Sequence, residues 1–471
     1  MMKIEQIYTG CLAEAAYYIE SNGEAAIIDP LREVAPYLKK AKQHGAVIKY
    51  IFETHFHADF VSGHIDLADK SGATIIYGPT AKTDFKAHIA ADGEQFKIGG
   101  LTITTLHTPG HTPESTSYLL SDEQGKNYCV FTGDTLFIGD VGRPDLAQQG
   151  ELTMEDMAAT LYDSLQSKIL TLPDDVIVYP AHGAGSACGK NMSKETFDTL
   201  GHQKQVNYAL KATSKEQFIK EVTDGILPPP QYFAKNAAMN KSGYSSIDEV
   251  FKKGMVALTP QEFEDSANQT GALILDTRDP QSFATGFIPN SINIGLNGQF
   301  APWVGALITD LKQQLLLVTA DGKAEETITR LARVGYDYTI GYLEGGIVAW
   351  QAEGKEIDRI ESISADAFEA ISNTSTVNAL DVRKPGEYEA EHLEVSLTRP
   401  LDYINDWTNE LNPEETYYIH CAGGYRSMIA ASILKARGMN QVVDIAGGYG
   451  AIKETNLKRT DFACPSKAMK A

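Results

Sequence analysis

Short apolar runs alternate with helix-like stretches along roughly the first 210 residues of the chain. The runs at 24–30, 47–52, 101–107, 128–131 and 176–179 have the length and the β-branched or aromatic content of strands. Residues 35–44 are predicted to form a helix that ends at Gly45. This alternation of strands and helices predicts an α/β domain.

Four of the predicted strands lead into loops that begin with histidine or aspartate residues. These loops read THFHADF at 54–60, TPGHTP at 108–113, TGD at 132–134 and PAHG at 180–183. Ligands from several strand ends, meeting at one edge of a sheet, are how an α/β scaffold builds a site. Because imidazole and carboxylate are the usual ligands of catalytic zinc or iron, the pattern predicts a metal centre. The candidate ligands are His55, His57, Asp59, His111, Asp134 and His182.

Length and charge narrow the class of protein. A chain of 471 residues is too long for one core and is expected to form about two to four domains. A net charge of -21 argues against nucleic acid and anionic membranes as partners, since both attract Lys and Arg. No stretch has the roughly 18 uninterrupted apolar residues of a membrane-spanning helix, and the first residues lack the apolar core of a signal peptide. Five widely spaced cysteines form neither a disulfide framework nor a CxxC zinc motif, so we expect a reducing cytoplasm: Cys11, Cys129, Cys188, Cys421 and Cys464.

The sequence changes character near residue 225. Three consecutive prolines at 228–230 favour a stiff, extended spacer. We therefore place a first domain at 1–225 and a linker at 226–255. Beyond the linker the chain repeats with a period of a little over 100 residues: 273–280, 314–318 and 343–346 correspond to 378–385, 415–419 and 445–448. Each repeat reads strand, helix, strand, helix, which predicts two small parallel α/β domains at 256–357 and 358–471.

The second repeat places a cysteine directly before a predicted helix, in the loop CAGGYRS at 421–427. A thiol at this position feels the positive end of the helix and free backbone N–H groups, which favour the nucleophilic thiolate. Gly423 and Gly424 let the loop curl so that its N–H groups point inward. Arg426 can neutralise a thiolate, a persulfide or a sulfur oxyanion. Cys421 is therefore the candidate nucleophile, and a buried structural cysteine in a glycine-rich turn is the alternative.

The first repeat lacks this chemistry. Alignment of the two repeats puts Ala320 at the nucleophile position and Glu325 in place of the arginine. No cysteine lies between Cys188 and Cys421 in the sequence. We therefore expect this unit to be inactive, with a spacer or interface role.

The ordered motifs THFHAD, PGHT, FTGD and PAHG resemble the metallo-β-lactamase fold. The resemblance implies an αββα sandwich with metal at one edge. The dinuclear hydrolases of this fold usually carry a histidine after the aspartate of the first motif, where this chain has Phe60, so the second metal position should be weakened. The resemblance divides the candidate ligands between two positions: His55, His57 and His111 at the first, Asp59 and His182 at the second, and Asp134 at the first or at both.

The runs HTPES at 111–115, FTGDTLF at 131–137 and GDVGRPD at 139–145 look like the persulfide dioxygenase branch of the fold. That branch implies one Fe(II) per chain, held by His55, His111 and Asp134, with His57 beside the metal and not bound to it. Two histidines and one carboxylate leave positions open for O2 and substrate. The resemblance also implies a low-molecular-weight thiol persulfide as the substrate and sulfite as the product.

Both C-terminal units resemble rhodanese domains, which are three-layer α/β domains, through the D-x-R opening, the central loop and the closing GG. In that family the loop cysteine carries a persulfide, which implies this role for Cys421. The whole layout resembles the bacterial multidomain persulfide dioxygenase-sulfurtransferases of sulfide detoxification. This resemblance implies a bifunctional enzyme that handles sulfite and thiosulfate, and a homo-oligomer of two or four chains.

Several alternatives stay open. A glyoxalase II-type thiolester hydrolase with two zinc or iron ions shares the fold, and the C-terminal units could form a persulfide-sensing module. Arg143 can bind a substrate anion or pair with Asp145. His182 is a second-metal ligand or a hydrogen-bond donor beside the iron. Cys188, expected in an accessible loop near the site, either holds a sulfane sulfur or is an ordinary loop cysteine.

Overall fold

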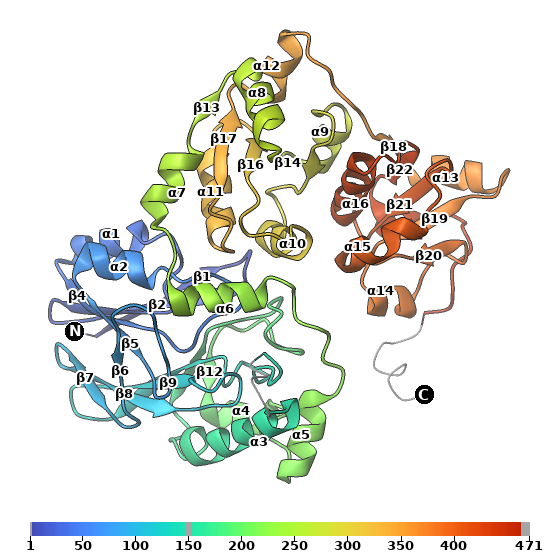
Figure 1. Ribbon diagram of the computed structural model, residues 1–471. Coiled ribbons are helices and arrows are strands. Elements are labelled where there is room, and N and C mark those ends of the chain that lie inside the picture. The colour runs from blue at the N-terminus through green and yellow to red at the C-terminus, as the bar shows by residue number, and fades with distance from the viewer. Residues whose placement is uncertain (1, 147–151, 463–471) are drawn as a thin grey trace. The chain divides into compact units, whose positions relative to one another are not determined.

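The computed structural model describes residues 2–146 and 152–462, so Cys464 lies outside the described residues. The chain divides into two compact units (Figure 1). The first unit runs to Glu249 and includes Leu331–Gly335, and the second comprises Val250–Arg330 and the described residues from Tyr336 onward. In the part of the chain described, no helix is both long and apolar enough to cross a bilayer.

The first unit is built on two six-stranded sheets. The strands of one sheet follow chain order: β1 (Lys3–Thr9), β2 (Glu14–Ser21), β3 (Glu24–Ile28), β4 (Val47–Phe52), β5 (Thr74–Tyr77) and β6 (His88–Ile89). The other sheet has the order β12-β11-β10-β9-β8-β7, made of β7 (Gln95–Ile98), β8 (Leu101–His107), β9 (Thr116–Ser121), β10 (Asn127–Gly133), β11 (Ile177–Pro180) and β12 (Asp198–Thr199).

Alternating side chains fill the layers of this unit. Successive residues of a strand point to opposite faces of the sheet. Ile19 and Phe52 of the first sheet therefore join Ile103 and Phe131 of the second in one buried cluster between the sheets. Residues one position along, such as Ile51, belong to a second buried cluster with residues of the helices.

Helices cover the outer face of each sheet (Figure 1). Helices α1 (Ala35–His44) and α2 (His64–Ser71) contribute to the cluster on the first sheet, and α3 (Met154–Ser164) and α5 (Lys215–Thr223) to the cluster on the second. Helix α1 spans the predicted residues and ends at Gly45, whose φ of 66° suits glycine. The αββα sandwich is therefore confirmed. The helices of this unit are α1 (Ala35–His44), α2 (His64–Ser71), α3 (Met154–Ser164) with a π-turn at Leu165–Ile169, α4 (Leu200–Val206), α5 (Lys215–Thr223) and α6 (Phe233–Ser242).

The predicted linker at 226–255 is not an extended spacer throughout. Prolines 228–230 lie outside helices, but α6 and α7 (Ile247–Gly254) follow within the same segment. Helix α6 buries Phe233, Asn236 and Asn240 in the first unit. The helix-breaking effect of proline is local, so it ends at residue 230 and leaves the next residues free to form helix.

The second unit contains two parallel five-stranded sheets with the same topology, as the sequence repeat predicted. The first sheet has the order β13-β17-β16-β14-β15, made of β13 (Ala257–Leu258), β14 (Leu273–Asp276), β15 (Ile292–Asn293), β16 (Leu315–Val318) and β17 (Thr339–Leu343). The second has the order β18-β22-β21-β19-β20, made of β18 (Glu361–Ile363), β19 (Asn378–Asp381), β20 (Ser396–Thr398), β21 (Tyr417–His420) and β22 (Val442–Ile445).

Helices accompany both sheets of the second unit. Those of the first repeat are α8 (Pro260–Thr270), α9 (Pro280–Ala284), α10 (Phe300–Leu307), α11 (Ala324–Ala332) and α12 (Gly346–Ala352). Those of the second are α13 (Ala365–Ser372), α14 (Pro385–Ala390), α15 (Ile404–Trp407) between 3-10 turns at Leu401–Tyr403 and Thr408–Glu410, α16 (Tyr425–Ala436) and α17 (Gly448–Ile452).

Candidate functional site

Three buried side chains from three strand ends meet at one point in the first unit. His55 follows β4, His111 lies between β8 and β9, and Asp134 follows β10. Asp134 Oδ2 lies 3.8 Å from His55 Nε2 and 3.4 Å from His111 Nε2. None of these three atoms has a hydrogen-bond partner. Buried polar atoms left unpaired are costly, so three of them aimed at one point fit a bound metal ion.

A contact on the far side orients each of these ligands. Thr54 Oγ1 donates to Asp29 Oδ2 (2.8 Å) and lies 3.0 Å from His55 Nδ1. With its proton committed to Asp29, the hydroxyl accepts from Nδ1–H, and this assignment leaves Nε2 of His55 free to bind metal. In the same way, His111 Nδ1 donates to the Arg143 carbonyl at 2.8 Å.

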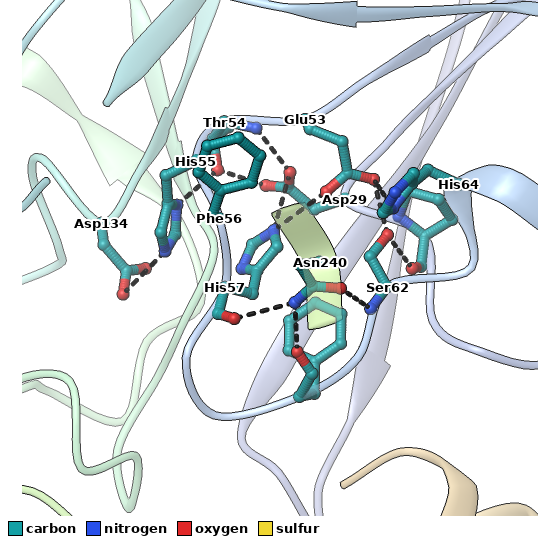
Figure 2. A network of polar contacts seen from close by, with 12 residues as sticks. Asp29, Glu53, Thr54, His55, Phe56, His57, Ser62, His64, Asp134 and Asn240 are labelled. Atoms are coloured by element: carbon teal, nitrogen blue, oxygen red, sulfur yellow. Dashed lines mark hydrogen bonds and ion pairs between the residues drawn. The ribbon is translucent and has the colours of Figure 1, made fainter. Parts of the chain in front are cut away.

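His57 pairs with carboxylates outside this cluster, as Figure 2 shows. Its Nε2 lies 3.0 Å from Asp29 Oδ1 and 3.5 Å from Glu53 Oε2. Burial lowers the pKa of His57, but the carboxylates of Asp29 and Glu53 raise it by more than burial lowers it. The pKa therefore lies well above its usual value. The ring of Phe60 lies against His57 at 4.3 Å between centroids. His57 therefore belongs to a separate buried ion-pair cluster in this structure.

A second group lies beside Asp134. His182, which follows β11, has Nδ1 2.7 Å from Asp134 Oδ1 and Nε2 2.8 Å from Asp59 Oδ2. The Cys188 sulfur lies within 4.8 Å of donor atoms of Asp59 and His182, so this trio could also hold a cation. Cys188 is 1% exposed, and burial raises the pKa of its thiol well above the usual value. The loop is exposed at Ala184, Gly185 and Ala187, as predicted, but the thiol of Cys188 is not, because hydrogen bonds from Arg143 to the Ala187 and Cys188 carbonyls hold this end of the loop against the protein.

Arg143 is engaged with protein groups. Its guanidinium binds both carboxylate oxygens of Asp145 at 2.7 Å and also donates to the carbonyls of Ala187 and Leu227. Two roles were considered for Arg143, binding a substrate anion and pairing with Asp145. In the structure Arg143 pairs with Asp145. The side chain ties together loops around the site.

Sequence reasoning missed Asp29 and Asn240. Asp29 follows strand β3 and so obeys the same strand-end rule as the ligands, which could have found it. Asn240 of α6 donates to the carbonyls of His57 and Phe60 and accepts from the Ser62 N–H (Figure 2). No local signal marks Asn240, because the groups it binds are some 180 residues away in the sequence.

The loop around Cys421 curls as predicted. Gly424, with φ 98°, donates its N–H to the Cys421 sulfur at 3.1 Å. The Cys421 carbonyl accepts from the N–H of Tyr449 at 2.6 Å. A Cβ on Gly448 would lie 2.4 Å from that carbonyl oxygen, so the packing requires glycine there.

Arg426 lies beside this loop but is paired. Its guanidinium donates two hydrogen bonds to Glu387, at 2.6 and 2.9 Å. Cys421 itself is 2% exposed. The Cys421 sulfur thus lies at the N-terminus of helix α16, where backbone N–H groups can stabilise it and the Arg426 guanidinium is nearby.

Two family models match the chain: the metallo-beta-lactamase superfamily at residues 9–182, and the rhodanese-like domain at 259–353 and 364–455. A crystal structure described as a metallo-beta-lactamase from Staphylococcus aureus subsp. aureus COL is 32% identical, with a TM-score of 0.64. The match covers 73% of this chain and 98% of that one. The chain belongs to the metallo-β-lactamase superfamily. It carries two rhodanese-like domains, the arrangement that the sequence motifs predicted.

Relatives with two different activities match part of this chain. Human mitochondrial persulfide dioxygenase ETHE1 is 34% identical over 210 residues, covering 44% of this chain and 74% of that protein. A hydroxyacylglutathione hydrolase of Salmonella arizonae is 36% identical over 202 residues, covering 43% of this chain and 72% of that protein. Sequence identity alone therefore does not distinguish the two activities, so the geometry of the site must be used to choose between them.

The two rhodanese-like domains share a structural D-x-R pair. Arg383 binds both oxygens of Asp381 and donates to the Glu391 carbonyl. Arg278 makes the same contacts with Asp276 and the Gly286 carbonyl. The repeated geometry supports a scaffold role for this motif.

Strand register corrects the predicted alignment of the two rhodanese-like loops. Asp381 pairs with His420, the residue before Cys421. The equivalent Asp276 pairs with Val318, so Thr319 occupies the nucleophile position. Ala320 and Glu325 were therefore assigned one residue too far along, and Ala324 stands in place of the arginine. The loop sequences share too little to fix the register, which the strands set by hydrogen bonding. The prediction that this unit lacks a thiol is unaffected.

Proposed function

We propose that the metallo-β-lactamase domain is an Fe(II) persulfide dioxygenase that converts a low-molecular-weight thiol persulfide and O2 to sulfite. The proposal depends chiefly on one observation: His55, His111 and Asp134 converge, while His57 pairs with Asp29 and Glu53. Two histidines and one carboxylate on one side of a metal suit non-haem iron, with positions open for two further ligands. Its persulfide dioxygenase relatives support the assignment.

Bound iron would supply the binding and activation of O2, which side chains cannot. The protein's part is to hold the ligands and exclude water. Thr54 and the Arg143 carbonyl fix the tautomers of His55 and His111, and His182 holds the carboxylate of Asp134. The reaction balances as RSSH + O2 + H2O → RSH + SO3²⁻ + 2H⁺.

Metal content and O2 consumption of anaerobically purified protein test this proposal. We expect about one iron per chain, O2 uptake on addition of a thiol persulfide, and the appearance of sulfite or thiosulfate. Absence of O2 uptake by the iron-loaded protein would contradict it.

We further propose that Cys421 of the second rhodanese-like domain is a sulfurtransferase nucleophile coupled to the first reaction. It would combine sulfane sulfur with the sulfite formed at the iron site, giving RSSH + SO3²⁻ → RSH + S2O3²⁻. The Gly424 N–H donated to the sulfur, at the start of α16, supports a nucleophilic role for Cys421. Fusion in one chain raises the effective concentration of each product at the next site.

The variant Cys421→Ala tests the coupling. Supplied with persulfide and O2, it should consume O2 at the parent rate and accumulate sulfite in place of thiosulfate. Thiosulfate formation at the parent rate would eliminate the proposed role of Cys421.

A second candidate is a dinuclear thiolester hydrolase, in which a metal-bound hydroxide attacks the ester carbonyl. The group Asp59, His182 and Cys188 favours it, because these residues could hold a second cation beside the first. The hydrolase relatives favour it as well. Two metal ions per chain, with hydrolysis of a glutathione thiolester and no O2 uptake, would establish it. If the rhodanese-like domains instead only sense persulfide, the protein should show no turnover with sulfite or thiosulfate.

A further inference from the structure

Cys421 opens onto a cavity of about 430 Å³ within the second unit. Pockets for small organic ligands typically measure about 300–1,000 Å³. A small inorganic anion such as thiosulfate needs only a fraction of that space. The cavity is therefore large enough for a donor with an organic part.

The wall of this cavity comes from both rhodanese-like domains. Lys384, Tyr425 and Arg426 belong to the domain of Cys421, but Gln299 and Trp303 belong to the domain that lacks a thiol. Gln299 precedes α10 and is exposed, whereas Trp303 within α10 is 5% exposed. The small exposed part of Trp303 lines the cavity, and the burial of the rest fixes its ring in place.

Specific contacts hold this second wall in place. The Tyr425 hydroxyl donates to the Gly295 carbonyl at 2.7 Å. A Cβ on Gly298 would lie 2.7 Å from the Tyr425 ring, so glycine allows the loop before α10 to approach. The buried Asn293 N–H donates to Ser432 of α16 at 2.9 Å. The position of α10 at the cavity is thus set by hydrogen bonds and close packing.

The chemistry of the lining indicates the class of ligand. Lys384 and Arg426 favour an anion near the sulfur, although Glu387 offsets part of the charge of Arg426. Trp303 and Tyr425 offer apolar aromatic area, and Gln299 offers both a donor and an acceptor for amide groups. Cation, aromatic surface and amide together suit a peptide-like thiol with carboxylates.

We propose that the rhodanese-like domain without a thiol forms the specificity wall of the Cys421 site, where Trp303 and Gln299 bind the organic part of a peptide-like thiol persulfide. This inference rests on the proposed sulfurtransferase activity of Cys421. In the step concerned, the Cys421 thiolate attacks the outer sulfur of RS–SH. The new bond is Sγ–S, the RS–S bond breaks, and RS⁻ leaves, so no external oxidant or reductant is needed.

The test compares two sulfur donors on the full-length protein, with cyanide as acceptor: glutathione persulfide, which has a peptide part, and thiosulfate, which has none. In Trp303→Ala, KM for glutathione persulfide should rise by about tenfold, the scale of one lost aromatic anchor. Its kcat, and both constants for thiosulfate, should stay within about twofold. Trp303→Phe should retain most of the affinity. Val348→Ala, at a 72% exposed site of the same domain, is the matched control.

A second variant covers the case in which Trp303→Ala does not fold. Gln299→Trp changes an exposed residue and narrows the cavity, so it should raise KM for glutathione persulfide and spare thiosulfate. An unchanged KM for glutathione persulfide in the folded variants would overturn the specificity wall, and so would equal losses for both donors. Inactivity of the parent protein with both donors would instead refute the sulfurtransferase proposal itself.

Discussion

His55 and His57 show how two identical side chains, two residues apart, take different chemical roles. His55 points to Asp134, while His57 points to Asp29 and Glu53 (Figure 2). Both lie in the irregular loop after β4, so the partners that each ring meets decide its role. The carboxylates beside His57 stabilise its imidazolium, and burial together with the charge of His57 lowers the pKa of His55. His55 is thus kept as the neutral imidazole that a metal requires.

At the residue scale, His111→Ala should reduce bound iron to well under one per chain and lower O2 uptake by at least about 100-fold. His111 is one of three candidate ligands, and its Nε2 atom has no hydrogen-bond partner in the protein, so its removal takes away a metal-binding group. Metal analysis and an oxygen electrode give the result. His88→Ala, which removes a histidine paired with Glu94 away from the site, should change neither.

Also at this scale, Gly448→Ala should lower sulfurtransferase kcat/KM by about tenfold or more. The added Cβ would lie 2.4 Å from the Cys421 carbonyl oxygen, and φ of 56° strains any side chain, so the loop must shift. O2 uptake should be unaffected, since the proposed iron site lies in the other unit. Gly386→Ala has open space around it and serves as the control.

Helix α6 is an element whose role the sequence did not reveal. It lies in the segment predicted as a spacer, yet Asn240 binds backbone groups of the loop that carries His55 and His57. Three hydrogen bonds from one buried amide fix the shape of a loop that has no regular structure of its own. The helix thereby supports the metal site from a distant part of the chain.

At the element scale, Asn240→Ala should destabilise the protein by about 2–5 kcal/mol, because it leaves two carbonyls and one N–H buried without partners. The melting temperature should fall by roughly 5–15 °C, and iron should bind less tightly. Calorimetry and metal titration measure the two effects. The neighbouring exposed Lys241→Ala should leave both unchanged; a similar loss in that variant would point to the helix as a whole and not to the amide.

At the scale of the whole molecule, the two candidate sites lie in separate compact units. The candidate iron ligands all lie in the first unit, and Cys421 lies in the second. Each site is completed by contacts within its own unit, so each should work without the other.

Removal of iron should separate the two activities. Treatment with a chelator under anaerobic conditions should abolish O2 uptake and leave sulfur transfer from thiosulfate to cyanide within about twofold of the untreated rate. Re-addition of Fe(II) should restore O2 uptake. Parallel loss of both activities would show that Cys421 depends on the metal and contradict this independence.

Residue patterns alone predicted an α/β first domain, two repeated domains and a metal centre at strand ends, whereas the αββα sandwich and the set of His55, His111 and Asp134 came from the resemblance of the motifs to known families. The features predicted without the resemblance follow from local patterns, namely strand periodicity, the loops at strand ends and the repeat of the second half. The sequence also indicated that one rhodanese-like domain has no thiol.

Four features emerged only from the folded chain: the partners of His57, the burial of Cys188, the contacts of Asn240, and the register that makes Thr319 equivalent to Cys421. Each depends on partners far away in the chain: carboxylates on another strand, a loop folded over the site, a helix some 180 residues away, or a neighbouring strand. A linear pattern records which groups a residue carries. Which groups it meets is settled when the sheets and helices pack, because burial forces every polar group to find a partner.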